Sequence, residues 1–235
     1  MPLIVLEGLD GAGKSTQLNL LRERAIQKGY STEFLHFPRI DTPVWGELIA
    51  RFLRGELGDI ETVDPQIVAL LFAGDRRDTP ELCRWLDKGA YVFLDRYVYS
   101  NVAYQCAKLD AKNRDDLIEW ILRLEFVYFE IPRPDLSIFV NVPFSFTRQK
   151  LLEVREGTDR DYLQGNRDIH EASLELQRRV RDVYLGLASR EVYFGEGYKN
   201  PPLRIVDCFD SEENMLSPEA IHEKIVALAN DMFTL

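Results

Sequence analysis

A glycine-rich segment near the start of the sequence, GLDGAGKST from Gly8 to Thr16, leaves few folds open to this chain. It follows the apolar run Leu3 to Leu6, which predicts a short buried strand. After it, apolar residues at helical spacing predict a helix from Lys14 to Lys28, which ends at Gly29. A strand, a glycine-rich turn and a helix in this order are typical of the first unit of a parallel α/β sheet.

The same segment has the spacing of a phosphate-binding loop, with Gly8, four residues, then Gly13, Lys14 and Ser15. Backbone N–H groups and the positive end of the following helix attract an anion there, and glycine lets the backbone approach it closely. Lys14 is expected to reach the β- and γ-phosphates, and Ser15 to ligate Mg²⁺. The alternative is a strand-to-helix turn that merely favours glycine. The flanking strand and helix favour a nucleoside triphosphate site, with ATP as the expected ligand.

Strands and helices alternate along the rest of the chain, which predicts a parallel sheet with helices on both faces. Asp64 and Pro65 predict the start of a helix that continues to Lys88, where Gly89 ends it. At 235 residues the chain fits one domain, 1–235. We therefore expect an α/β P-loop NTPase fold, a three-layer sandwich around a central parallel sheet. The other predicted strands are Thr32 to Phe37, Tyr91 to Leu94, Leu136 to Val142 and Leu203 to Val206, and the other predicted helices are 43–54, 143–154, 168–188 and one beginning at Ser217.

Composition excludes several classes of partner. The net charge of −10 argues against DNA or RNA, whose binders usually carry a broad basic face. No apolar stretch approaches the roughly 20 residues of a membrane span. Three scattered cysteines without metal-type spacing suggest a reducing compartment, so we expect a cytoplasmic protein that acts on small molecules.

Charged residues follow two of the predicted strands, at the edge where α/β sheets bind ligands. Asp95 and Arg96 come directly after one strand and are placed to hold Mg²⁺ and phosphate, and Arg39 follows another. Phe72 and Arg76 lie four apart on one predicted helix, where an aromatic ring and an arginine can hold a planar base. Taken singly, Phe72 could be a core residue and Arg76 a surface ion-pair partner. Their occurrence together with the phosphate loop favours the nucleotide interpretation.

These motifs, taken in order, resemble the thymidylate kinase family over most of the chain. The segments that carry the resemblance are LEGLDGAGKST, FPR, LLFAGDRRD, DRYVYSNVAYQCAK, RPDLSIFVNV and DRDYLQGNRDIHEASLELQRRVRDVY. The resemblance implies transfer of the γ-phosphoryl group of ATP to dTMP, with Mg²⁺ bound to ATP, by a homodimeric enzyme.

The resemblance also implies roles for individual residues. Asp10 should meet the 3′-hydroxyl of the acceptor sugar, while Arg39 and Arg96 should clamp the acceptor phosphate. Phe72 should stack on thymine, and Arg76 should bond its carbonyl edge. The residues expected to approach the base and deoxyribose are Asn101, Tyr104 and Gln105, with Tyr104 as the barrier against a 2′-hydroxyl. For Asn101 and Gln105, ordinary helix surface is the alternative.

The family's mobile lid corresponds to about 155–167. The reaction needs a cation near the transferred phosphoryl group, and this sequence carries small residues, Gly11 and Ala12, inside the loop where some members carry arginine. The lid should then supply it, with Arg160 ahead of Arg155 and Arg167. The expected catalytic residues are therefore Lys14, Asp10, Asp95, Arg96 and Arg160, the metal ligands are Ser15 and Asp95, and the ATP-binding residues are Gly8, Gly11, Ala12, Gly13, Lys14, Ser15, Thr16 and Arg148, the last packing against adenine.

Two other functions remain open on the sequence. A deoxynucleoside kinase of the same fold would need a carboxylate base near a 5′-hydroxyl, whereas the strand that precedes Arg39 ends in a phosphate clamp. A nucleotide-dependent switch protein would have no small acceptor. The Phe72 and Arg76 pair, which suits the base of an acceptor nucleotide, argues against this function.

Overall fold

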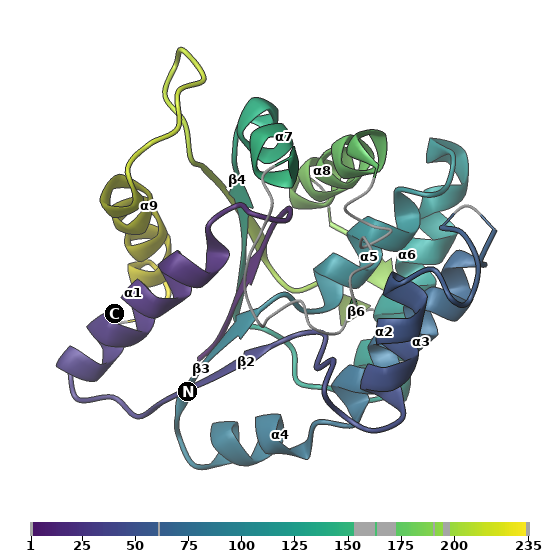
Figure 1. The fold of residues 1–235 in the computed structure, drawn as a ribbon. Helices are drawn as coiled ribbons and strands as arrows, with labels where there is room; N and C mark the ends of the chain where they lie inside the picture. The colour runs from purple at the N-terminus through teal and green to yellow at the C-terminus, as the bar shows by residue number, and fades with distance from the viewer. Residues whose placement is uncertain are drawn as a thin grey trace.

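The protein is described here from a computed structural model, which covers residues 2–60, 62–152, 163, 173–189, 191–194 and 198–233. Its centre is a parallel sheet of five strands in the order β2-β3-β1-β4-β7 (Figure 1). The strands are β1 (Leu3–Glu7), β2 (Thr32–His36), β3 (Tyr91–Asp95), β4 (Leu136–Asn141) and β7 (Leu203–Asp207). The sequence therefore predicted every strand of this sheet, and the parallel pairing follows from the helical crossovers between consecutive strands.

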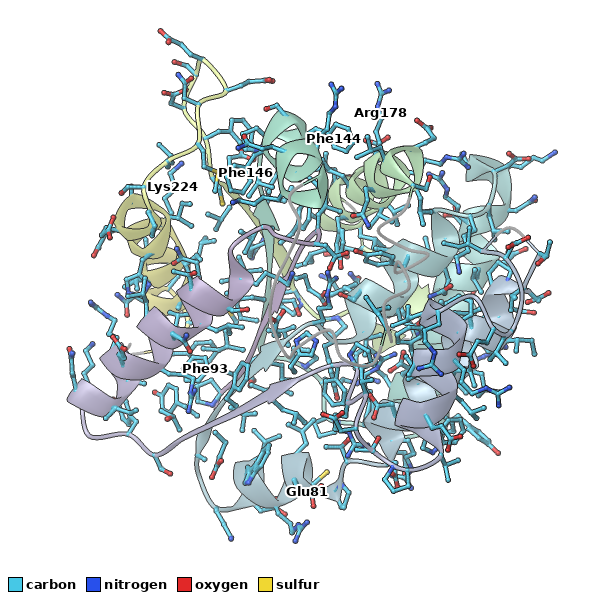
Figure 2. The ribbon with its side chains drawn as sticks, in the orientation of Figure 1. Glu81, Phe93, Phe144, Phe146, Arg178 and Lys224 are labelled. Atoms are coloured by element: carbon cyan, nitrogen blue, oxygen red, sulfur yellow. The ribbon has the colours of Figure 1, made fainter. Side chains whose placement is uncertain are left out.

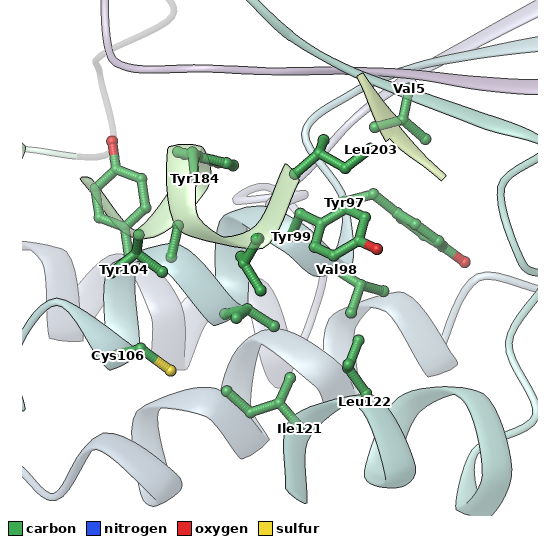
Figure 3. Close-up of a cluster of buried hydrophobic side chains, with 14 of the residues drawn as sticks. Val5, Tyr97, Val98, Tyr99, Tyr104, Cys106, Ile121, Leu122, Tyr184 and Leu203 are labelled. Carbon is green, nitrogen blue, oxygen red and sulfur yellow. The ribbon is translucent and has the colours of Figure 1, made fainter. Parts of the chain in front are cut away.

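Helices cover both faces of the sheet, as Figure 1 shows. Because side chains alternate along a strand, β1 sends Leu3 and Val5 into one hydrophobic cluster and Ile4 and Leu6 into the other. The second cluster also contains Phe93 of β3, labelled in Figure 2, and is closed by α1 (Lys14–Gln27) and α9 (Pro218–Asn230). The first is closed by α5 (Val98–Cys106), α6 (Arg114–Arg123) and α8 (Leu174–Ala188), and Figure 3 shows part of it. This is the expected three-layer P-loop sandwich.

The helix expected from Pro65 to Lys88 is in fact two helices, α3 (Pro65–Arg77) and α4 (Pro80–Asp87). Asp64 does cap α3, since its side chain accepts a hydrogen bond from the backbone N–H of Gln66. The prediction of one continuous helix was wrong because proline lacks an N–H and forces the residue before it out of helical conformation. Thr79, which precedes Pro80, accordingly has φ −127° and ψ 71°.

Smaller elements complete the described chain. They are α2 (Trp45–Leu53), the 3₁₀ turn η1 (Ala111–Asn113), the π-helical turn η2 (Leu124–Tyr128), α7 (Phe144–Leu152) and the short antiparallel pair β5 (Tyr193–Phe194) and β6 (Tyr198–Lys199). The helix expected to begin at Asp168 has its described start at Leu174, because Ser173 is extended and caps it through its side chain. The predicted lid, 155–167, lies outside the described residues apart from Leu163. Among the described helices, none is long and apolar enough to cross a membrane.

The register of the sheet decides what meets at its carboxyl edge. Leu6 of β1 and His36 of β2 both pair with Asp95 of β3, so these three strands end at the same level. The glycine-rich loop after β1, the segment after β2 and Arg96 after β3 therefore leave the sheet side by side. This edge is where parallel sheets bind ligands.

Candidate active site

The glycine-rich loop closes around its own lysine. Gly11 and Gly13 have φ values of 75° and 82°, which a residue with a side chain rarely adopts, so both turns require glycine. The Lys14 ammonium is buried and donates to the carbonyl oxygen of Leu9 at 3.0 Å and more weakly to that of Gly8 at 3.5 Å. Burial, with the neighbouring positive charge of Arg96, lowers the pKa of Lys14, while nearby carboxylates oppose this. A phosphate in the loop would supply the strong anionic partner that these carbonyl groups replace.

The two predicted metal ligands lie together at the mouth of the loop. The Ser15 hydroxyl donates to Oδ2 of Asp95 at 3.3 Å, and the Lys14 ammonium lies 3.9 Å from Oδ1 of the same carboxylate. Burial raises the pKa of Asp95, but the charge of Lys14 and the contact with His36 outweigh it and hold this pKa at about 2. Nδ1 of His36, a residue without an expected role, lies 3.3 Å from Oδ2. A permanently ionised carboxylate beside a hydroxyl is a hard-oxygen pair of the kind that Mg²⁺ accepts.

Arg96 directly follows β3, and its side chain reaches Asp10 of the phosphate loop. Its backbone has φ 66°, an unfavourable value for a residue with a side chain, and its N–H donates to the carbonyl oxygen of Leu6. The guanidinium donates to Oδ1 of Asp10 at 2.7 Å and to the Ser100 hydroxyl at 3.2 Å, and lies over the ring of Tyr104. The strained backbone thus aims this buried cation at the carboxylate that the sequence assigned to the acceptor sugar.

Further buried residues support this centre, and Glu7, Tyr184 and Gln177 among them lie in no motif that marks them as part of a site. Oε2 of Glu7 accepts from the Ser100 hydroxyl at 2.5 Å and from the Tyr184 hydroxyl at 3.0 Å, behind the Arg96 guanidinium. Burial raises the pKa of Glu7, against the hydrogen bond from Ser100 and the charge of Arg96. Gln177 of α8 donates to Oδ2 of Asp10 at 3.4 Å. These residues come from three elements, β1, α5 and α8, so only the folded chain reveals their association.

The predicted base-binding residues form a second buried group, between α3 and α5. Arg76 is 3% exposed and binds the carboxylate of Glu125 through two nitrogens, at 2.5 and 2.6 Å. Asn101 donates to the same carboxylate at 2.9 Å. Arg76 is therefore an ion-pair partner, but not at the surface. Helix surface is the wrong description of Asn101 and Gln105, which are 3% and 1% exposed.

Other predicted residues lie around these two groups. Phe72 packs edge-to-face on Phe52 with ring centres 6.5 Å apart. The amide oxygen of Gln105 accepts from the ammonium of Lys108 at 2.7 Å. The Tyr104 hydroxyl donates to Oδ2 of Asp10 at 2.8 Å, and since burial raises its pKa this hydroxyl stays protonated and a donor. α5 thus carries side chains into both groups.

Arg39 makes no hydrogen bond to the residues around Lys14 and Arg96 in the described part of the chain. Its guanidinium donates to Oδ1 of Asp75 at 2.8 Å and to the carbonyl oxygens of Asp75 and Asp78, at the C-terminal end of α3. Its backbone N–H also donates to Asp75, so the segment after β2 is tied to α3.

The remaining residues predicted to bind ATP differ in how exposed they are. Gly8 and Ala12 are buried in the loop, Thr16 is exposed on α1, and Arg148 is exposed on α7. The predicted lid arginines, Arg155, Arg160 and Arg167, lie outside the described residues.

Comparisons with known proteins agree with this arrangement. The sequence model of the thymidylate kinase family matches residues 6–202. Among curated proteins, a probable thymidylate kinase of Pyrococcus abyssi is 36% identical over 96% of this chain and 94% of its own length. The thymidylate kinase of Mycobacterium tuberculosis is 35% identical over 80% of this chain and 86% of its own length. A solved thymidylate kinase of Candida albicans shares the fold, with a TM-score of 0.67 at 23% identity, over 98% of this chain and 91% of that one. The chain described here belongs to the thymidylate kinase family.

Proposed function

We propose that this chain transfers the γ-phosphoryl group of ATP to dTMP, giving ADP and dTDP. The observation that carries the proposal is the contact between Arg96 and Asp10 at 2.7 Å. Arg96 follows β3 on the expected acceptor side, whereas Asp10 lies inside the phosphate loop. Two residues expected to bind the acceptor therefore contact each other on the phosphate loop itself, so the acceptor site adjoins the ATP site at the sheet edge, as direct in-line transfer requires.

The arrangement suits an acceptor that is already an anion. The second pKa of a phosphomonoester is about 6, so its oxygen is largely ionised at neutral pH and needs no general base. The obstacle is bringing two anions together, since two unit charges about 4 Å apart repel by roughly 4 kcal/mol at an effective dielectric constant of about 20. Lys14 and Arg96 place two buried cations at this point. They would offset the repulsion and stabilise the charge as it moves.

Ser15 and Asp95 would hold Mg²⁺ together with the ATP phosphates. Their contact at 3.3 Å puts a hydroxyl and an ionised carboxylate at the same place, which fits the hard-oxygen ligands of this ion. The ion would supply positive charge to the β- and γ-phosphates. Within the described residues, no cluster of three or more His, Cys, Asp or Glu side chains offers an alternative metal site.

The other assignments belong to the same proposal. Phe72 stacks on thymine, Arg76 bonds its carbonyl edge, Asn101 and Gln105 approach the base and deoxyribose, and Tyr104 excludes a 2′-hydroxyl. The expected roles of Arg39 as a phosphate clamp, Arg148 beside adenine and Arg160 in the lid stay predictions, as do the single kinase domain 1–235, the homodimer and the cytoplasmic location. For Arg39 the prediction requires that it leave Asp75 when the acceptor phosphate binds.

A coupled ADP-release assay across a panel of nucleoside monophosphates tests the proposal. We expect dTMP to stimulate ADP release strongly, and purine monophosphates and CMP to have little effect. ADP release that is independent of every acceptor would instead indicate a switch protein and would overturn the proposed function.

A further inference from the structure

A buried carboxylate without a role in the proposed chemistry links the two residues expected to read the base. Glu125 lies in the π-helical turn η2, which continues α6, and its side chain is fully buried. Its Oε2 accepts from Nε of Arg76, and its Oε1 accepts from Nη2 of Arg76 and from Nδ2 of Asn101. One carboxylate thus holds a side chain of α3 and a side chain of α5.

The hydrogen bonds of Asn101 fix which way its amide faces. Nδ2 donates to the carbonyl oxygen of Ala69 at 2.9 Å and to Oε1 of Glu125 at 2.9 Å. Both partners are pure acceptors, so only the NH₂ group of the amide can face them. Oδ1 must then face the other way. It is buried and has no hydrogen-bond partner among the described residues. A buried oxygen in this state is costly unless a donor reaches it.

Arg76 is fixed in a complementary way. Glu125 occupies Nε and Nη2 of the guanidinium, which leaves Nη1 as the nitrogen without a hydrogen bond to a described residue. A guanidinium nitrogen can only donate. The Glu125 carboxylate therefore leaves these two side chains with one acceptor that has no hydrogen-bond partner, Asn101 Oδ1, and one such donor, Arg76 Nη1, among the described residues.

We propose that Glu125 is a positioning residue that sets base specificity by holding Asn101 as an acceptor and Arg76 as a donor. This inference rests on the proposed function, because it names how that site selects its acceptor nucleotide. Thymine and uracil present an N3–H donor and an O4 acceptor, which match this pair. Cytosine presents an N3 acceptor and an N4 amino donor. Its N3 would face the acceptor Oδ1 of Asn101, and its amino group would face the donor Nη1 of Arg76, so neither hydrogen bond could form. The arrangement selects against cytosine, and it does not distinguish thymine from uracil.

The substitution Glu125→Gln tests this with almost no change of shape. The new amide can donate to Oδ1 of Asn101, so the asparagine can turn and offer Nδ2 to the base, at the cost of its hydrogen bond to the carbonyl oxygen of Ala69. We expect the ratio of kcat/KM for dTMP to kcat/KM for dCMP to fall by about ten- to a hundredfold, and the ratio of dTMP to dUMP to stay the same. The KM for ATP should not change, because Glu125 makes no described contact with the phosphate loop. The matched control is Glu119→Gln on α6, the same change at an exposed position.

Loss of a buried charge beside Arg76 can also impair folding, so circular dichroism of each variant accompanies the kinetics. Asn101→Ala keeps the Arg76–Glu125 pair and removes only the amide. It should lower the dTMP to dCMP ratio to a similar extent, and Glu125→Gln added to it should lower that ratio little further. A folded Glu125→Gln that keeps the wild-type ratio would overturn the inference. If Glu125→Gln does not fold, an unchanged ratio in Asn101→Ala would overturn it instead.

The failure of the inference is distinct from that of the proposed function. A wild-type protein that does not phosphorylate dTMP would refute the proposed function, and the inference with it. A wild-type protein that prefers dTMP to dCMP, with variants that keep this preference, would refute only the role of Glu125.

Discussion

The hydroxyl of Tyr104 donates a hydrogen bond of 2.8 Å to Oδ2 of Asp10, so a side chain of α5 is tied to the glycine-rich loop across the sheet edge. Arg96 binds the other oxygen of the same carboxylate. The loop that would hold ATP and the helix that would hold the acceptor are thus joined at one carboxylate. Any substitution at this junction should affect use of the acceptor more than binding of ATP.

The hydroxyl and the ring of Tyr104 are expected to have different functions, which substitutions can separate. Tyr104→Phe removes the hydrogen bond to Asp10 but keeps the ring, so we expect kcat/KM for dTMP to fall about tenfold while the preference for dTMP over its ribonucleotide analogue remains. Tyr104→Ala also removes the bulk that would meet a 2′-hydroxyl, and this preference should fall. Kinetics with both acceptors check this, with Tyr128→Phe, 78% exposed, as the control. Loss of the preference in Tyr104→Phe would refute the steric role.

Ser15 should matter for Mg²⁺ and not for dTMP. In Ser15→Ala the hydroxyl beside Asp95 is absent, and we expect the Mg²⁺ concentration for half-maximal activity to rise on the order of tenfold. The thermal shift produced by dTMP alone should not change. Mg²⁺ titrations of the wild type and of Ser31→Ala, an exposed serine, provide the comparison. An unchanged Mg²⁺ requirement would show that Ser15 is not a ligand.

Lys108 should make the folding stability of the protein depend on pH in the alkaline range. Burial lowers the pKa of Lys108 to about 7, and its ammonium lies over the ring of Phe52. In the unfolded chain the pKa is about 10.4, so the unfolded state binds more protons between about pH 7 and 10.4, and stability rises with pH across this window. Below pH 7 both states are protonated and the full cost of burying the charge is present.

Lys108→Met should therefore stabilise the protein at pH 7 by up to a few kcal/mol, and its advantage over the wild type should shrink as the pH approaches 10. Urea unfolding at several pH values measures this, with the exposed Lys112→Met as the control. An advantage that stays constant with pH would mean that Lys108 remains charged in the folded protein.

Two glycines should respond oppositely to the same substitution. A Cβ on Gly74 of α3 would lie 2.5 Å from the ring of Trp45, whereas a Cβ on Gly186 of α8 would meet nothing within 4 Å. Gly74→Ala should cost about 1–3 kcal/mol of unfolding free energy, because the packed tryptophan must move. Gly186→Ala should add about 0.5–1 kcal/mol, because alanine restricts the unfolded chain and favours helix. Urea titrations that give both variants the same sign would contradict the packing of α2 on α3.

The elements that sequence predicts best here are those with local causes. The loop after β1 follows from glycine spacing, and the caps at Asp64 and Ser217 both accept the backbone hydrogen bonds expected of them. The break at Thr79 also has a local cause, since Pro80 follows it and cannot continue a helix through the residue before it. Apolar periodicity therefore does not predict a continuous helix across a proline.

The parts of the site that sequence did not reveal depend on distant contacts. Glu125 lies 49 residues from Arg76, in a stretch with no motif, and only the packing of η2 against α3 brings them together. Glu7 and Gln177 reach the Arg96 and Asp10 centre in the same way. Arg39 shows the reverse case. Its position after β2 was predictable, but its present partner, Asp75, was not, because an ion pair depends on which side chains the folded chain brings within reach.

The most direct test of the account offers the protein ATP and Mg²⁺ with either dTMP or thymidine and separates the products by chromatography. The central claim is that buried cations at one sheet edge let an anionic phosphate acceptor attack ATP without a general base. It predicts that dTDP and ADP accumulate in equal amounts with dTMP, and that thymidine is left unchanged. Conversion of thymidine to dTMP, with dTMP itself left unphosphorylated, would contradict it.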